Sequence, residues 1–447
     1  MKKLGILCLL LSLIATFGCA GVGIETVSNP PSNPSENGGP VGPDPKTTPE
    51  SFVSALVTLN FFALGGDFPP NLVIPDIDGM RGTAFVISFF PTAVIPIDLD
   101  TGAVSTKFQL FDASAIPEAA FPNSLWIESP SRAYLLGFTH VVVFNPTTGT
   151  LLGTRSLTDP INLTQILPYS QPGDCDGNNI DESSVGPGPY SPSFPASVAV
   201  HSGRLFVTMS NACFDPSFES FYVQGILLVF DILDSAPYLT PASTPFLVLP
   251  GFNVTGLTAT SDRLIATSTG DTSLQSGVAI PETDSFLTEI DPVDIKINRL
   301  LNLGLVAVNF QALAVNAPET LGFIGSSAFS EMYEIDLENF LALRGKDDPI
   351  VLFAGDDDFI SDQEIAYGDQ VLFASSFNHS GVKGVDLTDP NRMVLPNVLD
   401  FSFESNPGVT GAGPMALRPG QAGIDYSGPD LWVLTASPGT LSNARTY

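Results

Sequence analysis

Short apolar runs separated by polar turn residues follow one another along most of the chain, and one pair of runs recurs seven times. The first runs of the pairs span 69–74, 122–127, 195–200, 254–259, 310–315, 362–367 and 413–418. The second runs span 83–89, 132–138, 204–210, 263–269, 320–326, 370–376 and 430–436. Runs of this length bounded by turn residues predict β-strands, so each pair predicts a hairpin.

A third apolar run follows in six of the seven repeats, and each ends in a carboxylate or an amide. These terminal residues are Asp98, Asn145, Asp231, Asp291, Asp336 and Asp386. Asp and Asn accept hydrogen bonds from turn N–H groups, so we expect them to cap turns. Repeats of roughly 50 residues with about four strands each are typical of a β-propeller. The expected fold class is therefore all-β, as a seven-bladed β-propeller.

The last repeat is too short to supply a whole blade, because only eleven residues follow its second run. The segment 51–62 is strand-like and precedes the first repeat. We expect this segment to add the missing outer strand of the last blade, which would join the two ends of the domain and remove an exposed edge. The propeller domain is predicted to span residues 51–447.

The repeat pattern resembles that of the seven-bladed YVTN and quinoprotein-like propellers, many of which are bacterial extracytoplasmic proteins. The resemblance covers residues 51–447. The Trp-containing repeat signature of the cofactor-binding quinoprotein enzymes is absent, since the only tryptophans are Trp126 and Trp432. The resemblance thus implies a fold without implying an activity, because propellers carry many unrelated functions.

The composition is strongly acidic, with 47 Asp and Glu against 17 Lys and Arg and a formal net charge of −30. Such a chain repels nucleic acid and anionic lipid headgroups, and it is compatible with cations or basic partners. Mean hydropathy is nevertheless +0.25. Blade strands covered on both faces explain this value, and the runs at 140–144 and 226–230 are of that kind.

The N-terminus has the features of a secretory signal peptide over residues 1–18, with Lys2 and Lys3 before an apolar stretch. Its end resembles a bacterial lipoprotein signal, in which a small residue precedes a Cys that becomes diacylated. That resemblance implies a lipid on Cys19, although Thr16 and Phe17 depart from the usual pattern. It also implies anchoring in the outer membrane of a Gram-negative cell, facing the periplasm or the exterior. Ordinary cleavage nearby, which releases a secreted protein, is the alternative.

Residues 19–50 follow the signal and contain seven prolines with several Gly, Ser and Asn. This composition cannot bury a core and predicts a disordered linker that holds the propeller away from the membrane.

Long segments are expected on one face of the propeller, where strands two to three and strands four to the next blade are connected. These segments span 171–194, 211–224, 269–284, 355–362 and 402–413. Connecting loops carry function more often than the strands that they join, so this face is the predicted binding face. His140 and His379 are expected on this face and His201 on the opposite one. The histidines are expected to be exposed loop residues, and the alternative is a catalytic pair across the central channel.

Cys175 and Cys213 are the only cysteines beyond the signal region, and both fall in loops of the predicted binding face. In an oxidising compartment they are expected to form a disulfide. A catalytic or metal-binding role is the alternative, with no neighbouring His to complete a cluster.

Two acidic segments are candidate metal sites. Oxygen ligands at near-alternate positions partly resemble the start of a calcium loop, and the alternative is a solvated acidic turn. The first candidate set is Asp174, Asp176, Asn178 and Asp181, and the second is Asp356, Asp357, Asp358 and Asp362. Calcium is the only cofactor that the sequence suggests.

Two functions remain open at this point. The first is a membrane-anchored extracytoplasmic binding or scaffolding propeller that presents its long-loop face to a protein or glycan partner. The alternative is an extracytoplasmic hydrolase or lyase that uses loop carboxylates, assisted by calcium. A carboxylate pair with raised pKa in the central channel would favour the enzyme, whereas a broad exposed apolar patch would favour the binding protein.

Overall fold

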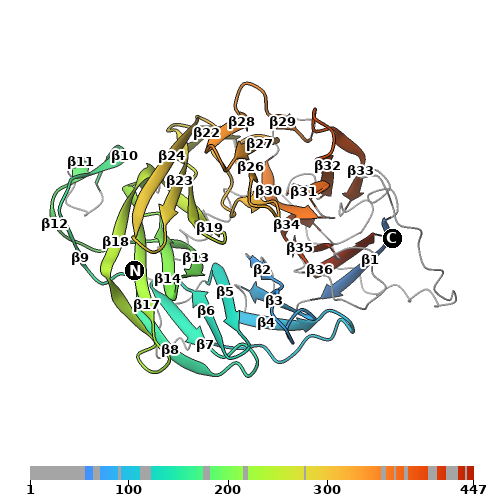
Figure 1. The fold of residues 1–447 in the computed structure, drawn as a ribbon, viewed down its shortest axis with the longest axis horizontal. Helices are drawn as coiled ribbons and strands as arrows, with labels where there is room; N and C mark the ends of the chain where they lie inside the picture. Colours follow the sequence, from blue (N-terminus) through green and yellow to red (C-terminus); the bar gives the residue numbers. More distant parts are fainter. Residues whose placement is uncertain are drawn as a thin grey trace.

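The computed structural model shows a ring of β-sheets (Figure 1). The residues that it describes are 56–63, 71–88, 92–110, 122–174, 182–214, 220–275, 278–353, 359–366, 369–376, 381–400, 410–418, 431–437 and 440–446. These residues contain strands and turns and no helix, so the all-β expectation is confirmed. In particular, no helix in this described part has the length and hydropathy to span a bilayer.

Seven sheets of three or more strands form the ring, and we number them in chain order. Sheet one contains β2 (Asn71–Val73), β3 (Thr83–Ser88) and β4 (Ala93–Asp98). Sheet two contains β5 (Ser124–Ser129), β6 (Arg132–Leu136), β7 (His140–Phe144) and β8 (Leu151–Ser156). Sheet three contains β13 (Pro195–His201), β14 (Arg204–Met209), β17 (Gln224–Ile232) and β18 (Leu239–Phe252). Sheet four contains β19 (Val254–Ala259), β20 (Leu264–Ser268), β23 (Ser285–Asp291) and β24 (Lys296–Gly304).

The remaining three sheets complete the circle. Sheet five contains β25 (Ala314–Val315), β26 (Leu321–Gly325), β27 (Glu331–Asp336), β28 (Leu341–Arg344) and β29 (Ile350–Val351). Sheet six contains β30 (Ile360–Ala366), β31 (Val371–Ser376), β32 (Gly381–Asp386) and β33 (Val394–Asp400). Sheet seven contains β34 (Thr410–Leu417), β35 (Leu431–Ser437), β36 (Thr440–Thr446) and β1 (Leu56–Ala63).

The N-terminal strand closes the ring as expected. β1 is the outermost strand of sheet seven and pairs antiparallel with β36, with Leu59 opposite Ala444 and Ala63 opposite Thr440. In Figure 1 the blue β1 lies beside the red β36. Sheet seven, hereafter the closing sheet, is thus the one sheet built from both ends of the described chain.

The expectation of seven four-stranded blades needs a correction, because only six of the described sheets have four or more strands. Sheet one has three. Beyond β4 the chain runs alongside it through two isolated bridges, Val94 with Phe108 and Ile97 with Val104. Residues 111–121 lie outside the described part, so a regular fourth strand is not seen here.

The core lies between neighbouring sheets. Trp432 on β35 is fully buried and packs in one cluster with Val86 of β3 and Ile95 of β4, which joins the closing sheet to sheet one. Strands covered on both faces have near-continuous apolar sequences, as in β7, where Val141 to Phe144 are all buried. Double burial accounts for the positive mean hydropathy of an acidic chain.

Four extra two-stranded sheets project from the ring. They pair β9 (Ile161–Leu163) with β12 (Gly188–Tyr190), β10 (Leu167–Gly173) with β11 (Glu182–Val185), β15 (Ala212–Phe214) with β16 (Ser220–Tyr222), and β21 (Thr272–Gln275) with β22 (Val278–Pro281). Each lies in a connection from second to third strand or from one sheet to the next. They therefore lie on the face predicted to carry long segments, and we call them together the cap.

The residues that end the third strands cap the turns of the opposite face. Asn145 Oδ1 accepts from the backbone N–H groups of Thr147 and Thr148 at 2.9 and 3.0 Å. Asp291 Oδ1 accepts from those of Val293 and Asp294, both at 2.9 Å. Asp98, Asp336 and Asp386 make bonds of the same kind. The expected structural role is confirmed for these five residues, and Asp231 instead pairs with Arg204.

Candidate functional site

The cap is held together by a small polar network around Asp271, which is 3% exposed. Ser170 Oγ of β10 donates a hydrogen bond to Asp271 Oδ2 at 2.7 Å. The same Oγ accepts from the backbone N–H of Tyr222 on β16 at 2.9 Å. Burial raises the pKa of Asp271, and burial together with the charge of Asp271 raises that of Tyr222 to about 12. This network joins three of the four cap hairpins, those that contain β10, β16 and β21.

An aromatic row lies beneath the cap where sheets two and three meet. The rings of Phe138 and Phe194 are 4.7 Å apart in an edge-to-face arrangement, and those of Phe194 and Phe214 are 5.4 Å apart. All three rings are half-buried. Rings that remain partly accessible offer both apolar contact and a negative π face to a bound group.

The charge of the two faces differs. The segments 157–194, 210–223 and 269–284, which contain the cap, hold ten Asp and Glu and no Lys, Arg or His. Arg155 lies shortly before the first of these segments and pairs with Asp159 at 3.0 Å. Three other arginines lie at the turns of the opposite face, where they join neighbouring sheets. Arg132 donates to the carbonyl of Leu233, Arg204 to that of Val293, and Arg263 to that of Leu337, at 3.1, 2.8 and 3.1 Å. The segments of the cap are therefore acidic in sequence and contain no basic residue, and Glu182, Glu282 and Asp284 are acidic side chains among their described residues.

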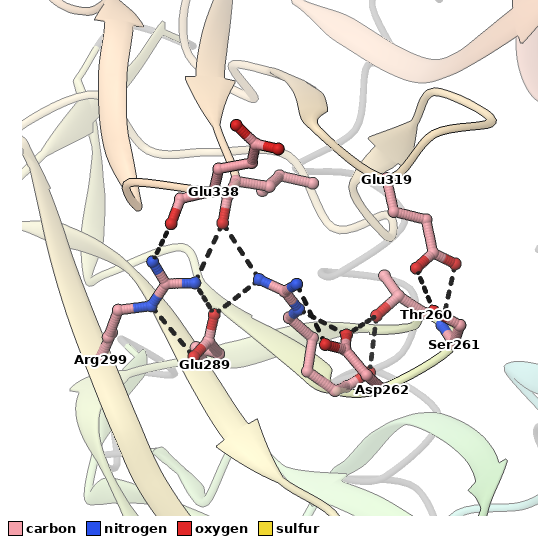
Figure 2. Close-up of polar contacts among 9 residues, drawn as sticks. Thr260, Ser261, Asp262, Glu289, Arg299, Glu319 and Glu338 are labelled. Carbon is pink, nitrogen blue, oxygen red and sulfur yellow. Dashed lines mark hydrogen bonds and ion pairs between the residues drawn. The ribbon is translucent and has the colours of Figure 1, made fainter.

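Figure 2 shows the densest of these arginine contacts, between sheets four and five. Glu289, which is 5% exposed, accepts from Arg263 Nη1 at 3.1 Å and from Arg299 Nε at 3.0 Å. Arg299 also donates to the carbonyls of Leu337 and Glu338 at 3.0 and 2.6 Å. Two guanidinium groups compensate one buried carboxylate here, and the same groups tie two sheets together.

A second buried carboxylate site lies on β30, the innermost strand of sheet six. Asp362 is 7% exposed and accepts from the backbone N–H of Met415 on β34 at 2.7 Å and of Gln363 at 2.9 Å. Glu364 is half-buried and lies two residues further along the strand, on the same face. Burial raises the pKa of Asp362 to about 7. Burial and the charge of Asp362 raise that of Glu364 well above its ordinary value.

From the sequence, Asp362 is expected in an acidic loop with Asp356, Asp357 and Asp358. The structure puts it on a strand, and the other three residues lie outside the described part, so this metal site stays a prediction. The first candidate metal site also stays a prediction. Asp174 is half-buried at the end of β10, and Asp176, Asn178 and Asp181 are not described. Within the described ranges no group of three His, Cys, Asp or Glu is arranged to hold a metal ion.

Cys213 lies half-buried on β15, and Cys175 lies outside the described residues, so the disulfide also stays a prediction. The neighbouring chain is consistent with it. Cys213 is paired in register with Phe221 of β16, and the Phe221 ring lies against Gly173, where a Cβ would be only 2.4 Å from it.

The histidines give no catalytic pair that can be described. His140 begins β7 on the cap side, with Nδ1 at 2.8 Å from Thr139 Oγ1. His201 ends β13 on the opposite side, with Nδ1 at 2.8 Å from Ser202 Oγ. His379 is outside the described residues. Cys19 and residues 1–50 are outside them as well.

No protein-family model matches the chain, and no curated protein matches it. Solved structures do match. The β-propeller domain of Cps50 (Swd1) from Myceliophteria thermophila aligns with a TM-score of 0.53 at 10% identity, over 87% of this chain and 100% of that one. The fold is a β-propeller. Hydrazine synthase from Kuenenia stuttgartiensis aligns with a TM-score of 0.51 at 10% identity, over 85% of this chain and 95% of that one. Likeness at this identity concerns the propeller fold alone.

Proposed function

We propose that this propeller is a binding protein whose cap takes a basic segment of a partner protein. The observation that carries the proposal is the charge of the cap, whose three segments hold ten acidic residues and no basic one. The half-buried row Phe138, Phe194 and Phe214 adds π faces that attract Lys and Arg side chains. Opposite charge speeds encounter and excludes anionic partners. An acidic glycan is therefore a poor ligand, and a neutral glycan is the other outcome to test.

The binding test uses a Lys- and Arg-rich peptide, a neutral oligosaccharide and an acidic peptide as probes, measured by calorimetry at two salt concentrations. The double variant Glu182→Gln with Glu282→Gln removes two cap charges, and Asp294→Asn with Glu338→Gln removes two from turns of the opposite face. We expect the basic peptide to bind, and its affinity to fall severalfold in the cap variant alone. If both double variants lost the same affinity for the basic peptide, binding would depend on net charge alone, and a cap site would be refuted.

We also propose that lipid on Cys19 anchors the protein at the outer membrane, with the Pro-rich linker as a spacer. The support is the signal-like sequence that ends at Cys19. Two acyl chains give durable anchoring, whereas one is marginal. In a bacterial host, Cys19→Ser should move the protein from the membrane fraction to the soluble fraction. Unchanged membrane association would require a different anchor.

We infer that sheet one is a seventh blade, completed by the segment that bridges to β4. Support comes from the backbone bonds on either side of this segment, in which Val94 and Phe108 exchange N–H groups and carbonyls at 3.1 and 2.8 Å. An experimental structure in which residues 103–110 leave sheet one would contradict this.

Two smaller proposals concern the cap. We expect Cys175 and Cys213 to form a disulfide, and protein purified without reductant should then contain no titratable thiol from either cysteine. We expect calcium at Asp174, Asp176, Asn178 and Asp181 to raise the melting temperature by a few degrees at most. Asp176→Ala should remove that shift, and a shift of equal size in the variant would assign calcium elsewhere.

A hydrolase or lyase is the second candidate, and the pair Asp362 and Glu364 is the observation that favours it, because carboxylates with raised pKa serve as general acids. The geometry favours the binding protein over this enzyme. Both oxygens of Asp362 already accept backbone hydrogen bonds, which leaves Glu364 as the accessible acid. The test is hydrolysis of a panel of glycosides and esters. Activity in the parent that is lost in Glu364→Gln would favour the enzyme over the binding protein.

A further inference from the structure

The backbone of Phe194, the middle residue of the aromatic row, is strained. Its φ angle is 54°, in the left-handed region that glycine and asparagine enter readily and a bulky aromatic residue does not. The residue also precedes Pro195, a position that favours extended backbone. Strained residues persist only where the surrounding structure fixes them, and they gather at ligand-binding sites.

Five hydrogen bonds hold this segment in place. The carbonyl of Phe194 accepts from the backbone N–H of Ser210 at 2.9 Å and from its Oγ at 3.0 Å. Ser193 donates its N–H to Oδ1 of the buried Asn211 at 3.1 Å, and its carbonyl accepts from the N–H of that residue at 3.0 Å. Ser193 Oγ donates to the carbonyl of Ala212 at 3.3 Å. The strained segment is thus fastened to the connection between β14 and β15.

The ring that is held in this way does not belong to the core. Among the described residues, the clusters of buried side chains between the sheets include none of Phe138, Phe194 and Phe214. Phe138 lies in the turn after β6 and Phe214 ends β15, so the Phe194 ring has one neighbour from sheet two and one from the cap. Glycine would adopt the backbone conformation of residue 194 without strain. The backbone therefore gives no reason for phenylalanine at this position, whereas a partly exposed aromatic ring does.

Charge complementarity indicates which side chain this ring accepts. The segments that contain the cap hold ten acidic residues and no basic one, so cations are drawn to this face. A phenylalanine ring attracts a cation through its π face but offers no hydrogen-bond acceptor. An ammonium group is strongly hydrated and would lose water there without gaining a partner, whereas a planar guanidinium is weakly hydrated and stacks on the ring. The aromatic row therefore favours arginine over lysine.

We propose that Phe194 is the anchor of the cap site and that it binds the guanidinium of an arginine in the partner. This inference rests on the proposed function, to which it adds the residue that makes the contact and the side chain that it selects. Phe138 and Phe214 position the Phe194 ring, with centroid distances of 4.7 and 5.4 Å, and part of its surface stays open. The fixed backbone holds the ring in place before the partner arrives, so less conformational freedom is lost on binding.

Two peptides of equal length and charge test the anchor, one with arginine and one with lysine at every basic position, and calorimetry measures both affinities. We expect the parent to bind the arginine peptide about threefold or more tightly than the lysine peptide. Phe194→Leu keeps an apolar side chain without a π face, so it should bind both peptides equally. Phe194→Tyr keeps the π face and should retain the preference. Phe329→Leu is the matched control, because Phe329 is half-buried in the turn between β26 and β27, in sheet five, and this variant should behave as the parent.

Phe194→Gly provides a second variant, since glycine adopts the same φ without strain and removes the ring entirely. It should also bind both peptides equally. A parent that binds both peptides with equal affinity overturns the anchor and leaves the basic partner standing, whereas a parent that binds neither peptide overturns both proposals. A preference for arginine that survives in Phe194→Leu and Phe194→Gly, or that Phe329→Leu also abolishes, overturns the anchor as well.

Discussion

Buried carboxylates are treated differently in sheets four and five and in sheet six. Glu289 and Glu334, 5% and 2% exposed, each lie beside two arginines that also bind a neighbouring sheet. Asp362 in sheet six accepts from two backbone N–H groups, and the half-buried Glu364 lies two residues further along the same strand. An arginine stays protonated at every accessible pH and therefore always compensates a buried negative charge. A bound proton neutralises the carboxylate only while the pH lies below the carboxyl pKa. The first arrangement gives a permanent joint and the second a conditional one.

The largest effect is expected from breaking a permanent joint. Arg392 donates to Glu334 at 2.9 and 2.5 Å, whereas the nearest contact of Arg344 to that carboxylate is 3.8 Å. Arg392→Ala leaves Glu334 buried and poorly compensated, so we expect a loss of about 3–5 kcal/mol in the free energy of unfolding. Urea titration measures it. Arg81→Ala, which removes exposed pairs with Asp76 and Asp78, should cost less than about 1 kcal/mol.

The conditional joint should respond to pH in a defined direction. A raised carboxyl pKa means that the folded state binds the proton more tightly than the unfolded chain. The stabilisation is therefore complete below the unfolded value near 4 and is lost as the pH rises through about 7 for Asp362. Glu364→Gln should leave the free energy of unfolding little changed at pH 5 and raise it at pH 8, because the glutamine carries no charge at either pH. A variant that is destabilised at pH 8 would contradict the absence of a compensating cation.

The cap network lies between these extremes, because its buried Asp271 has a neutral serine as partner. Ser170→Ala removes the donor to Asp271 and the acceptor for Tyr222, so a buried carboxylate loses a hydrogen bond. We expect a loss of about 1–2 kcal/mol in thermal unfolding, with increased proteolysis of the cap. Ser273→Ala is the matched control, since that hydroxyl donates to exposed Glu282, and it should change stability by less than about 0.5 kcal/mol.

The sequence predicted the strands well and the joints poorly, and the difference is physical. The second runs at 83–89, 132–138 and 204–210 match β3, β6 and β14 within two residues, because strand patterns and turn residues are local signals. The pairing of β1 with β36 also followed from a short last repeat. Contacts between sheets are not local: Arg132, Arg204 and Arg263 open second strands in the sequence, yet their partners lie in the next repeat.

The candidate site was harder to predict than the fold. Asp362 was grouped with the acidic residues before it, because three adjacent aspartates suggest a loop. The alternation of residues 360–366 instead indicates a strand, with Asp362 and Glu364 on one of its faces. Nothing in the sequence showed that the strands around them lack a basic residue, because that depends on which strands become neighbours. Asp271 was missed for the same reason, as its partner Ser170 lies 101 residues away.

The smallest effect is expected at the turns that end the third strands, where the chain contains its own control. Asp291 and Asn145 cap equivalent turns with two bonds each, one with a charge and one without. The turn N–H of Asp294 and that of Val293 lower the pKa of Asp291, so its contribution is present above the unfolded value near 4 and is lost as the pH falls further. Asp291→Asn should therefore lower the free energy of unfolding by less than about 0.5 kcal/mol at pH 7, because the amide oxygen keeps both bonds. Asp291→Ala should lower it by about 1 kcal/mol.

Urea titrations at pH 7 and pH 3.5 measure both variants. The difference between parent and Asp291→Asn should shrink at the lower pH, and Asn145→Ala should cost the same at both. An Asp291→Asn variant as unstable as Asp291→Ala would mean that charge rather than hydrogen bonding maintains these turns.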